Sequence, residues 1–236
     1  MQIIVLTSSF KHDEYTDYII EKFDLQAEDS TTTAIPNINR EELDSFDWNI
    51  GLIVGNSGSG KSTILNTFGK QEEFQYDYTK PIISQFPHMA PKEVVELFCG
   101  VGLSSVPTWL LKPQELSTGQ RARFDICSIL AFKRDSSGFV LLDEFTSVLN
   151  RECSKSLAYA LQRYVRKHDI KIVIASCHFD IIEWLQPDWV FNLNLEENGE
   201  VELVKMIYKD DKTVNVTKRI NSNESLSEAR ELCEKR

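Results

Sequence analysis

The sequence contains no run of apolar residues that approaches the roughly 18 needed to cross a membrane as a helix. Its opening segment, MQIIVLTSSF, lacks both the basic flank and the apolar length of a secretory signal. Low-complexity tracts, internal repeats and heptad insertions are also missing from the sequence. We therefore expect a compact protein of the cytoplasm rather than a membrane, secreted or fibrous one.

Cysteine and basic charge are both in short supply. The five cysteines show no CxxC or Cys/His ligand spacing, so reduced thiols are favoured over disulfides or zinc. With 26 Lys and Arg against 36 Asp and Glu, the net charge of −10 opposes unspecific adsorption to nucleic acid or anionic membranes, but it leaves room for a local basic groove. The 236 residues, 42% of them apolar, are enough to bury a substantial core.

A glycine-rich segment stands between a short apolar strand and an apolar helix pattern that ends at Gly69. Glycines let such a loop curl with its N–H groups inward, so that amides and the helix N-terminus hold phosphate oxygens. Lys61 then reaches the β- and γ-phosphates, and the Ser62 hydroxyl is placed to ligate magnesium. The alternative is an ordinary Gly/Ser loop before a helix. The predicted nucleotide-binding residues of this loop are Gly55, Asn56, Ser57, Gly58, Ser59, Gly60, Lys61, Ser62 and Thr63.

A pair of carboxylates follows a second apolar segment. Residues 139–142 are apolar without alternation, as in a strand that is covered on both faces, and Asp143 and Glu144 stand at its carboxyl end. We expect Asp143 to hold magnesium and Glu144 to act as the base for an attacking water. A helix N-cap would account for one acidic residue here, but less readily for two.

A third segment, LSTGQ at residues 116–120, opens a helix pattern that runs to about Arg134. On its own it is no more specific than a serine-capped helix start. Its position gives it weight, because Asp143 follows Gly119 by 24 residues.

Together these three segments resemble the ABC-type ATPases, whose signature LSGGQ is matched here except that Thr118 replaces the first glycine. The resemblance implies that a nucleotide on the phosphate loop of one subunit is completed by the signature of another. Ser117, Gly119 and Gln120 would then face the γ-phosphate of the opposite subunit. The expected assembly is a head-to-tail homodimer that closes around two ATP molecules with Mg²⁺ and opens on hydrolysis.

Three further residues occur in the same order along the chain as other motifs of this family. Residues 81–85 predict a strand end that delivers Gln85, similar to the family's glutamine that touches magnesium and water; alone, such a glutamine means little. The strand predicted at 171–177 delivers His178, in the place of the family's switch histidine, although a lone histidine is more often a satisfied polar residue. Asn150 stands where the family commonly has Asp, which puts the coupling between subunits in question. The predicted catalytic residues are therefore Glu144, His178 and Gln85, and the predicted magnesium contacts are Ser62, Gln85 and Asp143.

The resemblance also implies an α/β fold of the P-loop NTPase type, with a mainly parallel core sheet, flanking helices and a single domain over residues 1–236. In the β-rich lobe, Phe23 or Tyr15 is the candidate to stack on adenine, unless both belong to the core. A hairpin across Asn198-Gly199 is expected near the other end, and a short charged helix is expected from Ser225 to Arg236. The expected parts are a β-rich lobe at 1–50, a nucleotide core at 51–85 and 121–208, a helical lobe at 86–120 and a tail at 209–236.

The helical lobe is short. Only 31 residues separate Gln85 from Ser117, and they contain one good helix pattern, from Pro91 to about Cys99. This short lobe, together with the segments DWNIGLIVGNSGSGKST and WLLKPQELSTGQRAR, resembles the soluble ABC ATPases that stand alone in bacteria and phages and are elsewhere fused to a predicted acetyltransferase domain. We therefore expect a module that acts on a protein or nucleic-acid partner. The alternative is the ATPase subunit of a transporter with a separate permease chain, whereas a DNA-repair ATPase with long coiled coils is disfavoured.

Overall fold

The computed structural model describes residues 2–26, 30–71, 74–133, 138–194, 202–209 and 212–220. The described chain divides into two units: the residues up to Leu43 form one, and Asp44–Ile220 form the other. None of the helices in these described ranges has the length and apolar character that a membrane crossing requires.

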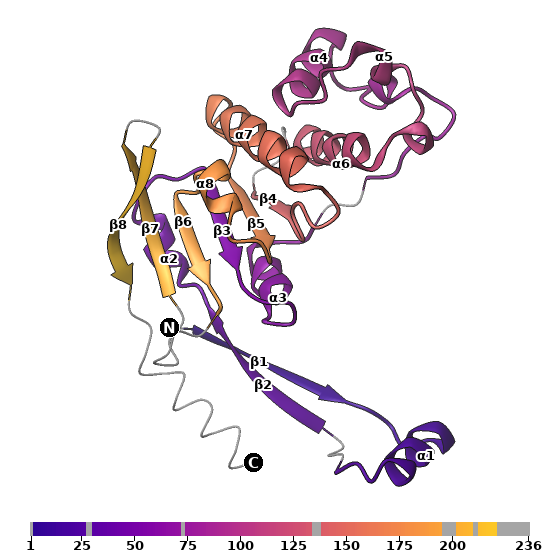
Figure 1. The fold of residues 1–236 in the computed structure, drawn as a ribbon, viewed down its shortest axis with the longest axis vertical. Helices are drawn as coiled ribbons and strands as arrows, with labels where there is room; N and C mark the ends of the chain where they lie inside the picture. The colour runs from indigo at the N-terminus through magenta and orange to yellow at the C-terminus, as the bar shows by residue number, and fades with distance from the viewer. Residues whose placement is uncertain are drawn as a thin grey trace. The chain divides into compact units, whose positions relative to one another are not determined.

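The first unit is a two-stranded antiparallel sheet with a helix between its strands (Figure 1). Strand β1 (Gln2–Ser9) pairs with β2 (Ser30–Asn37) over its whole length, and helix α1 (Glu14–Lys22) lies in the connection between them. Asp13 begins α1 by accepting hydrogen bonds from two backbone N–H groups. The structure thus places two strands and one helix in the segment expected as a β-rich lobe.

The second unit is built on a six-stranded sheet in the order β4-β5-β3-β6-β7-β8. The first four strands in this order run parallel, and β7 and β8 extend the sheet antiparallel. Every residue of β3, β4 and β5 is buried, which explains their unbroken apolar sequences. The mainly parallel core sheet is therefore confirmed. The strands are β3 (Ile50–Val54), β4 (Val140–Leu142), β5 (Ile172–Ser176), β6 (Trp189–Asn192), β7 (Glu202–Lys209) and β8 (Lys212–Ile220).

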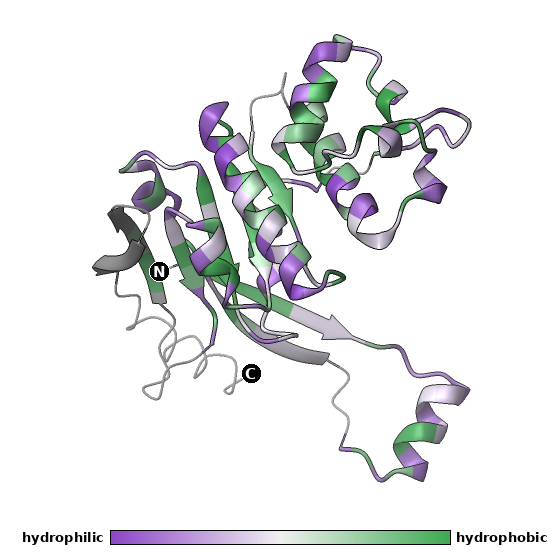
Figure 2. Ribbon diagram, turned by 45° about the horizontal axis from the view of Figure 1, so that its top comes forward, coloured by the Kyte–Doolittle hydropathy of each residue, from purple (hydrophilic) through white to green (hydrophobic). Residues whose placement is uncertain are grey.

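Helices flank this sheet and form a small lobe beside it (Figure 1). The apolar face of α7 is buried while its opposite face is polar, an alternation that Figure 2 shows along the ribbon. The helices of the second unit that flank the sheet are α3 (Lys61–Leu65), η1 (Asn66–Phe68), α6 (Thr118–Lys133), α7 (Arg151–Lys167) and α8 (Ile181–Leu185). Those of the lobe are η2 (Ile82–Ser84), α4 (Pro91–Gly100), α5 (Val106–Trp109) and η3 (Pro113–Glu115), while α2 (Arg40–Asp44) joins the two units in sequence.

The close approach of β3 and β6 explains one glycine. A Cβ atom on Gly51 would lie 1.9 Å from Cζ2 of Trp189, the fully buried tryptophan of β6. The Trp189 ring stacks on Phe68, whose centroid is 5.8 Å away. The glycine near the start of the phosphate-loop strand therefore leaves room for the stacked Trp189 and Phe68 rings.

Two expectations about secondary structure were wrong. The segment expected as a strand end, residues 81–85, instead contains the 3-10 turn η2 (Ile82–Ser84). Pro81 has no N–H to donate, and the N–H of Ile82 bonds to the carbonyl of Leu111 instead of to a neighbouring strand. The segment after residue 209 is not only a tail, because β8 pairs with β7 at the edge of the sheet. The antiparallel pairing of β6 with β7 is confirmed, but the expected turn at Asn198-Gly199 and the expected helix at 225–236 lie outside the described residues.

Candidate functional site

Three of the predicted segments meet at one edge of the sheet. The phosphate loop follows β3, Asp143 and Glu144 follow β4, and His178 follows β5. These strands are parallel neighbours in the order β4-β5-β3, so their carboxyl ends point to the same edge. Open α/β sheets place their ligands at this edge.

The phosphate loop has the backbone geometry that its glycines predict. Gly58 and Gly60 have φ angles of +78° and +94°, in the left-handed region, and Gly60 is the N-cap of α3. A Cβ atom on Gly55 would lie 2.7 Å from Oγ of Ser59, so the loop closes tightly there. The first N–H groups of a helix have no partner inside it, which leaves the N–H groups of Ser62 and Thr63 available to an anion.

Lys61 is a buried cation inside this loop. Its Nζ donates to the carbonyl of Gly55 at 3.0 Å and to that of Asn56 at 2.7 Å, and the residue is only 9% exposed. A buried ammonium needs compensation by polar partners, which the two carbonyls supply here. A loop that already encloses the Lys61 ammonium suits a phosphate group, because the positive charge of the ammonium balances the negative charge of the phosphate.

One residue that supports the loop was not predicted from the sequence. Asn194, just after β6, accepts a hydrogen bond from the backbone N–H of Asn56 at 2.9 Å. The contact fixes the first turn of the loop to the neighbouring strand. No local motif marks Asn194, because its role depends on the pairing of β6 with β3.

The acidic turn after β4 is held in a strained backbone conformation. Glu144 and Thr146 have φ angles of +47° and +71°, which cost on the order of 1–3 kcal/mol each for residues other than glycine. Two hydrogen bonds to β5 maintain the turn: Phe145 N–H donates to Ala175, and Ser176 Oγ donates to the Phe145 carbonyl. Strain of this kind concentrates at functional sites.

The two carboxylates differ in their surroundings. Asp143 is half-buried and accepts a hydrogen bond at 2.9 Å from the backbone N–H of Glu144, whereas Glu144 is exposed. A cavity of about 260 Å³ lies between this turn and α6, and both carboxylates line it. Carboxylate and hydroxyl oxygens are the ligands that Mg²⁺ prefers. The Asp143 carboxylate and the Ser62 hydroxyl thus have the chemistry of Mg²⁺ ligands, and their joint contact with the ion remains a prediction.

His178 lies at the end of β5 with a half-buried side chain. Its Nδ1 is buried and makes no hydrogen bond, and its backbone N–H donates to Ser176 Oγ at 3.1 Å. Burial, followed by the nearby guanidinium of Arg151, lowers the pKa of His178 below its usual value. The imidazole is therefore neutral at neutral pH and can offer one N–H to a ligand.

We expect His178 to titrate below pH 6.5, the ordinary histidine value, because burial and Arg151 both disfavour its charged form. A lowered histidine pKa contributes stability that is present above the unfolded pKa and is lost as the pH falls through it toward the folded one. Arg151→Ala should raise the midpoint only part of the way, because burial is the larger cause. An NMR titration of the ring measures this, with the exposed Arg163→Ala as the control. A wild-type midpoint at or above 6.5 would contradict it.

The LSTGQ segment forms the start of α6 as a reciprocal cap. The backbone N–H of Ser117 donates to Oε1 of Gln120 at 3.0 Å, and the N–H of Gln120 donates to Ser117 Oγ at 3.4 Å. Gln120 also donates to Thr108 Oγ1 in the helical lobe. The alternative of a serine-capped helix start is thus realised locally. The hydrogen bonds of Ser117 and Gly119 stay within residues 117–123, so they do not tie the signature to the phosphate loop of the same chain.

Asn150 has a structural role at the start of α7. Its side chain accepts a hydrogen bond at 2.8 Å from the backbone N–H of Cys153 and caps α7. Asn and Asp are almost equally good N-caps, so the fold does not distinguish them. The effect on coupling between subunits remains a prediction.

Gln85 is buried and does not point freely into the site. Its amide group bonds to the backbone of Asp77 and Lys80. The predicted contact with magnesium and water therefore requires these bonds to rearrange, and it remains a prediction.

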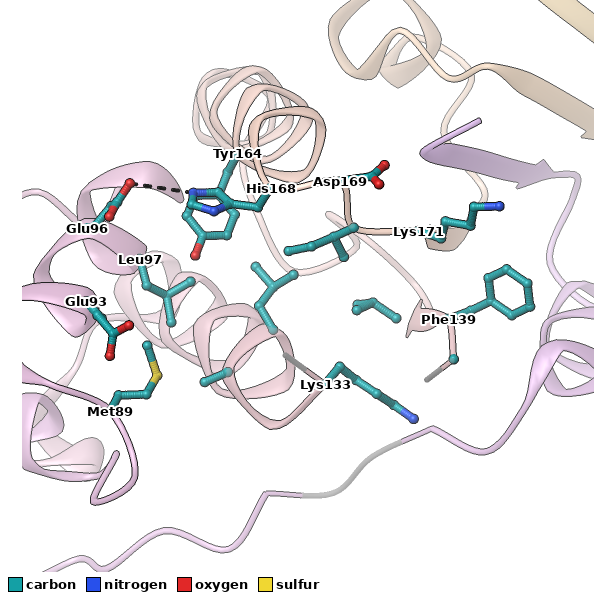
Figure 3. A pocket seen from close by; sticks show the side chains of 15 residues that line it. Met89, Glu93, Glu96, Leu97, Lys133, Phe139, Tyr164, His168, Asp169 and Lys171 are labelled. Carbon is teal, nitrogen blue, oxygen red and sulfur yellow. Dashed lines mark ion pairs between the residues drawn. The ribbon is translucent and has the colours of Figure 1, made fainter. Parts of the chain in front are cut away.

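A larger cavity, of about 480 Å³, lies at the opposite edge of the sheet, where β4 and β5 begin (Figure 3). Its carboxylates are already satisfied. Glu93 accepts from the N–H of Ala90 at 2.9 Å, and Glu96 pairs with Lys167 at 2.6 Å and with His168 at 3.6 Å, the pair drawn in Figure 3. The Lys167 hydrogen bond lowers the pKa of Glu96. This cavity holds none of the predicted site residues.

The fold of this chain is similar to that of solved ATP-binding cassettes, which are P-loop NTPases of the ABC type. Among solved structures, the ATP-binding cassette MJ0796, in a dimeric post-hydrolysis state bound to ADP and Pi, matches with a TM-score of 0.54 at 16% identity, over 86% of this chain and 98% of that one. A dimeric structure of MJ0796, described as a bacterial ABC transporter cassette, matches with 0.51 at 16% identity, over 81% and 94%. MJ1267, an ATP-binding cassette of an ABC transporter, matches with 0.50 at 15% identity, over 87% and 92%.

The sequence comparison agrees with the fold. The methionine import ATP-binding protein MetN of Clostridioides difficile is 26% identical over 193 residues, which are 63% of this chain and 57% of that protein. This chain thus matches little more than half of the length of that relative. No family model matches the sequence. The chain carries the nucleotide-binding domain fold of the ABC ATPases.

Proposed function

We propose that this protein binds ATP with Mg²⁺ and hydrolyses it to ADP and phosphate. The observation that carries the proposal is the buried Lys61 ammonium, held by loop carbonyls at the sheet edge where Asp143 and Glu144 also lie. A cation enclosed by a glycine loop at a strand-to-helix turn suits a polyphosphate better than any neutral ligand.

The residues divide the reaction between them. Lys61 and the loop N–H groups hold the β- and γ-phosphates. Ser62 and Asp143 would hold Mg²⁺, which would supply positive charge to neutralise the phosphates. Glu144 accepts a proton from the attacking water, or polarises it. The neutral His178 donates to the γ-phosphate. Gln85 positions the water once its side chain has left the backbone groups of Asp77 and Lys80.

We propose that a second copy of the chain completes this site. Ser117 and Gly119 stand at the start of α6, and their hydrogen bonds leave them unattached to the phosphate loop. The dimeric cassettes to which this chain is similar in fold support a symmetric pairing, in which each signature meets the nucleotide of the other copy.

We expect Ser117→Arg to prevent ATP-driven dimerisation, because the long side chain would occupy the place of the opposite γ-phosphate. The substitution is best made in a Glu144→Gln background, because that variant is not expected to hydrolyse the ATP that holds the dimer together. Light scattering with ATP and Mg²⁺ should show a dimer for Glu144→Gln and a monomer once Ser117→Arg is added. Ser104→Arg, at an exposed serine of the helical lobe, is the control that should still dimerise. A strictly monomeric Glu144→Gln protein would point to a different partner chain.

The process driven by ATP has two candidates. The short helical lobe favours a stand-alone cytoplasmic module that acts on a protein or nucleic-acid partner. The similarity to MetN, a methionine import protein by name, favours a transporter subunit instead. Copurification of Glu144→Gln with a membrane subunit, compared with recovery from the soluble fraction alone, distinguishes the two.

Recognition of the adenine base remains a proposal of its own. Tyr15 and Phe23 are 80% and 65% exposed, so either ring is available to stack on a base. Replacing each by leucine and measuring ATP against GTP affinity would assign the contact.

A further inference from the structure

The side chain of Gln85 is held by the turn that precedes it in the sequence. Its Oε1 accepts from the N–H of Asp77 at 2.9 Å, and its Nε2 donates to the carbonyls of Asp77 at 2.8 Å and Lys80 at 3.1 Å. Both amide protons and the amide oxygen are thus engaged. Because Gln85 is only 7% exposed, breaking these bonds without replacement would leave buried polar groups unpaired.

The turn that holds Gln85 is itself well fixed. The Asp77 carboxylate accepts from the backbone N–H of Thr79 at 3.0 Å and from its hydroxyl at 2.5 Å, and it pairs with Lys80 at 3.1 Å. The Thr79 hydrogen bonds, with help from Lys80, lower the pKa of Asp77 to about 2. The carboxylate therefore stays charged over the whole working pH range.

The residue before this turn, Tyr76, joins it to the signature helix α6. The Tyr76 hydroxyl donates to Asp125 Oδ1 at 2.6 Å, and the same oxygen accepts from Arg121 Nε at 2.7 Å. The Arg121 guanidinium lies 4.4 Å from the centre of the Tyr76 ring, and that ring packs on Phe124 with centroids 5.0 Å apart.

These contacts place Gln85 and the signature on one connected structure. Arg121, Phe124 and Asp125 belong to the first two turns of α6, directly after Ser117 and Gly119. On the other side, Phe86 follows Gln85 in sequence and packs edge-on against Phe124 at 6.0 Å. A shift of α6 toward a second copy would therefore displace the turn that holds Gln85.

We propose that Tyr76 and Asp125 are positioning residues that tie the placement of Gln85 to the position of the signature helix. The inference rests on the proposed ATPase function. Gln85 must leave its partners in this turn before it can position the water, and the Tyr76–Asp125 hydrogen bond transmits a shift of α6 to the turn that holds Gln85. The tether makes water positioning depend on whether α6 has met its partner.

Tyr76→Phe removes the hydroxyl and keeps the ring that packs on Phe124 and Arg121. We expect kcat to fall about tenfold, the size typical of losing one hydrogen bond to a charged group, with little change in KM for ATP. In a Gln85→Ala background the same substitution should have no further effect, because Tyr76 acts through Gln85. Tyr159→Phe, on a half-buried tyrosine of α7, is the control that should leave kcat unchanged. Equal losses in both backgrounds, or no loss in either, would overturn the proposal.

A second measurement needs no ATPase activity and so separates failure of the tether from failure of the proposed function. In the empty wild-type protein, the side-chain amide protons of Gln85 should be protected from hydrogen exchange, and Tyr76→Phe should make them exchange at least several-fold faster. Asp125→Asn serves if Tyr76→Phe does not fold. If the wild type hydrolyses no ATP, the exchange result alone decides: faster exchange supports the tether, and unchanged exchange overturns it.

Discussion

Glu144→Gln is expected to bind ATP as the wild type does and to lose most of its hydrolysis. The amide cannot take a proton from water as the carboxylate does, and general-base catalysis contributes about 10²–10⁴-fold in rate. The backbone should tolerate the change, because the strained turn is held by Phe145 and Ser176 rather than by the Glu144 side chain. Phosphate release measures the rate, and calorimetry with Mg-ATP measures the affinity.

Glu183→Gln is the matched control for this result, since Glu183 is an exposed carboxylate on α8 outside the site. It should hydrolyse ATP at the wild-type rate. Turnover by Glu144→Gln at the wild-type rate would remove Glu144 from the mechanism and leave only the phosphate-binding part of the account.

Lys61→Ala should weaken ATP binding or turnover by at least about tenfold, because it removes a charge-assisted hydrogen bond donor to the β- and γ-phosphates. The substitution also leaves the carbonyls of Gly55 and Asn56 without their ammonium partner. Unfolding should therefore be measured beside binding, so that a loss of affinity is not confused with a loss of structure.

Lys70→Ala, at an exposed lysine beyond η1, controls for the loss of one positive charge. It should bind ATP normally. If Lys61→Ala bound and hydrolysed ATP like the wild type, the assignment of the phosphate loop would be wrong.

The parts of the site that the sequence predicts are those whose geometry is set locally. Gly58 and Gly60 require left-handed backbone wherever the loop occurs, and the buried strands before the loop and before Asp143 are visible as unbroken apolar segments. Once these strands are parallel neighbours, their carboxyl ends lie at the same edge of the sheet, which brings the loop and the carboxylates to that edge.

What the sequence did not reveal depends on contacts between distant segments. The partners of Gln85 are set by a turn that local propensity does not mark, and Pro81 changes an expected strand into a 3-10 turn. Likewise, the tether from Tyr76 to Asp125 spans 49 residues, and the bond from Asn56 to Asn194 spans 138. Strand β8 was not predicted, because its formation depends more on its pairing with β7 than on the strand preference of its own charged sequence.

The central claim is that the signature of one copy completes the nucleotide site of another. Mixing Lys61→Ala with Ser117→Arg tests it most directly, because each variant alone lacks part of every composite site. In the mixed dimer, one site combines an intact phosphate loop with an intact signature. Because Ser117→Arg is not expected to pair with itself, working sites form only in mixed dimers, which carry one such site each and give at most about half of wild-type turnover when the two sites work independently. We predict phosphate release by the mixture well above the sum of the separate variants; release equal to that sum would contradict the account.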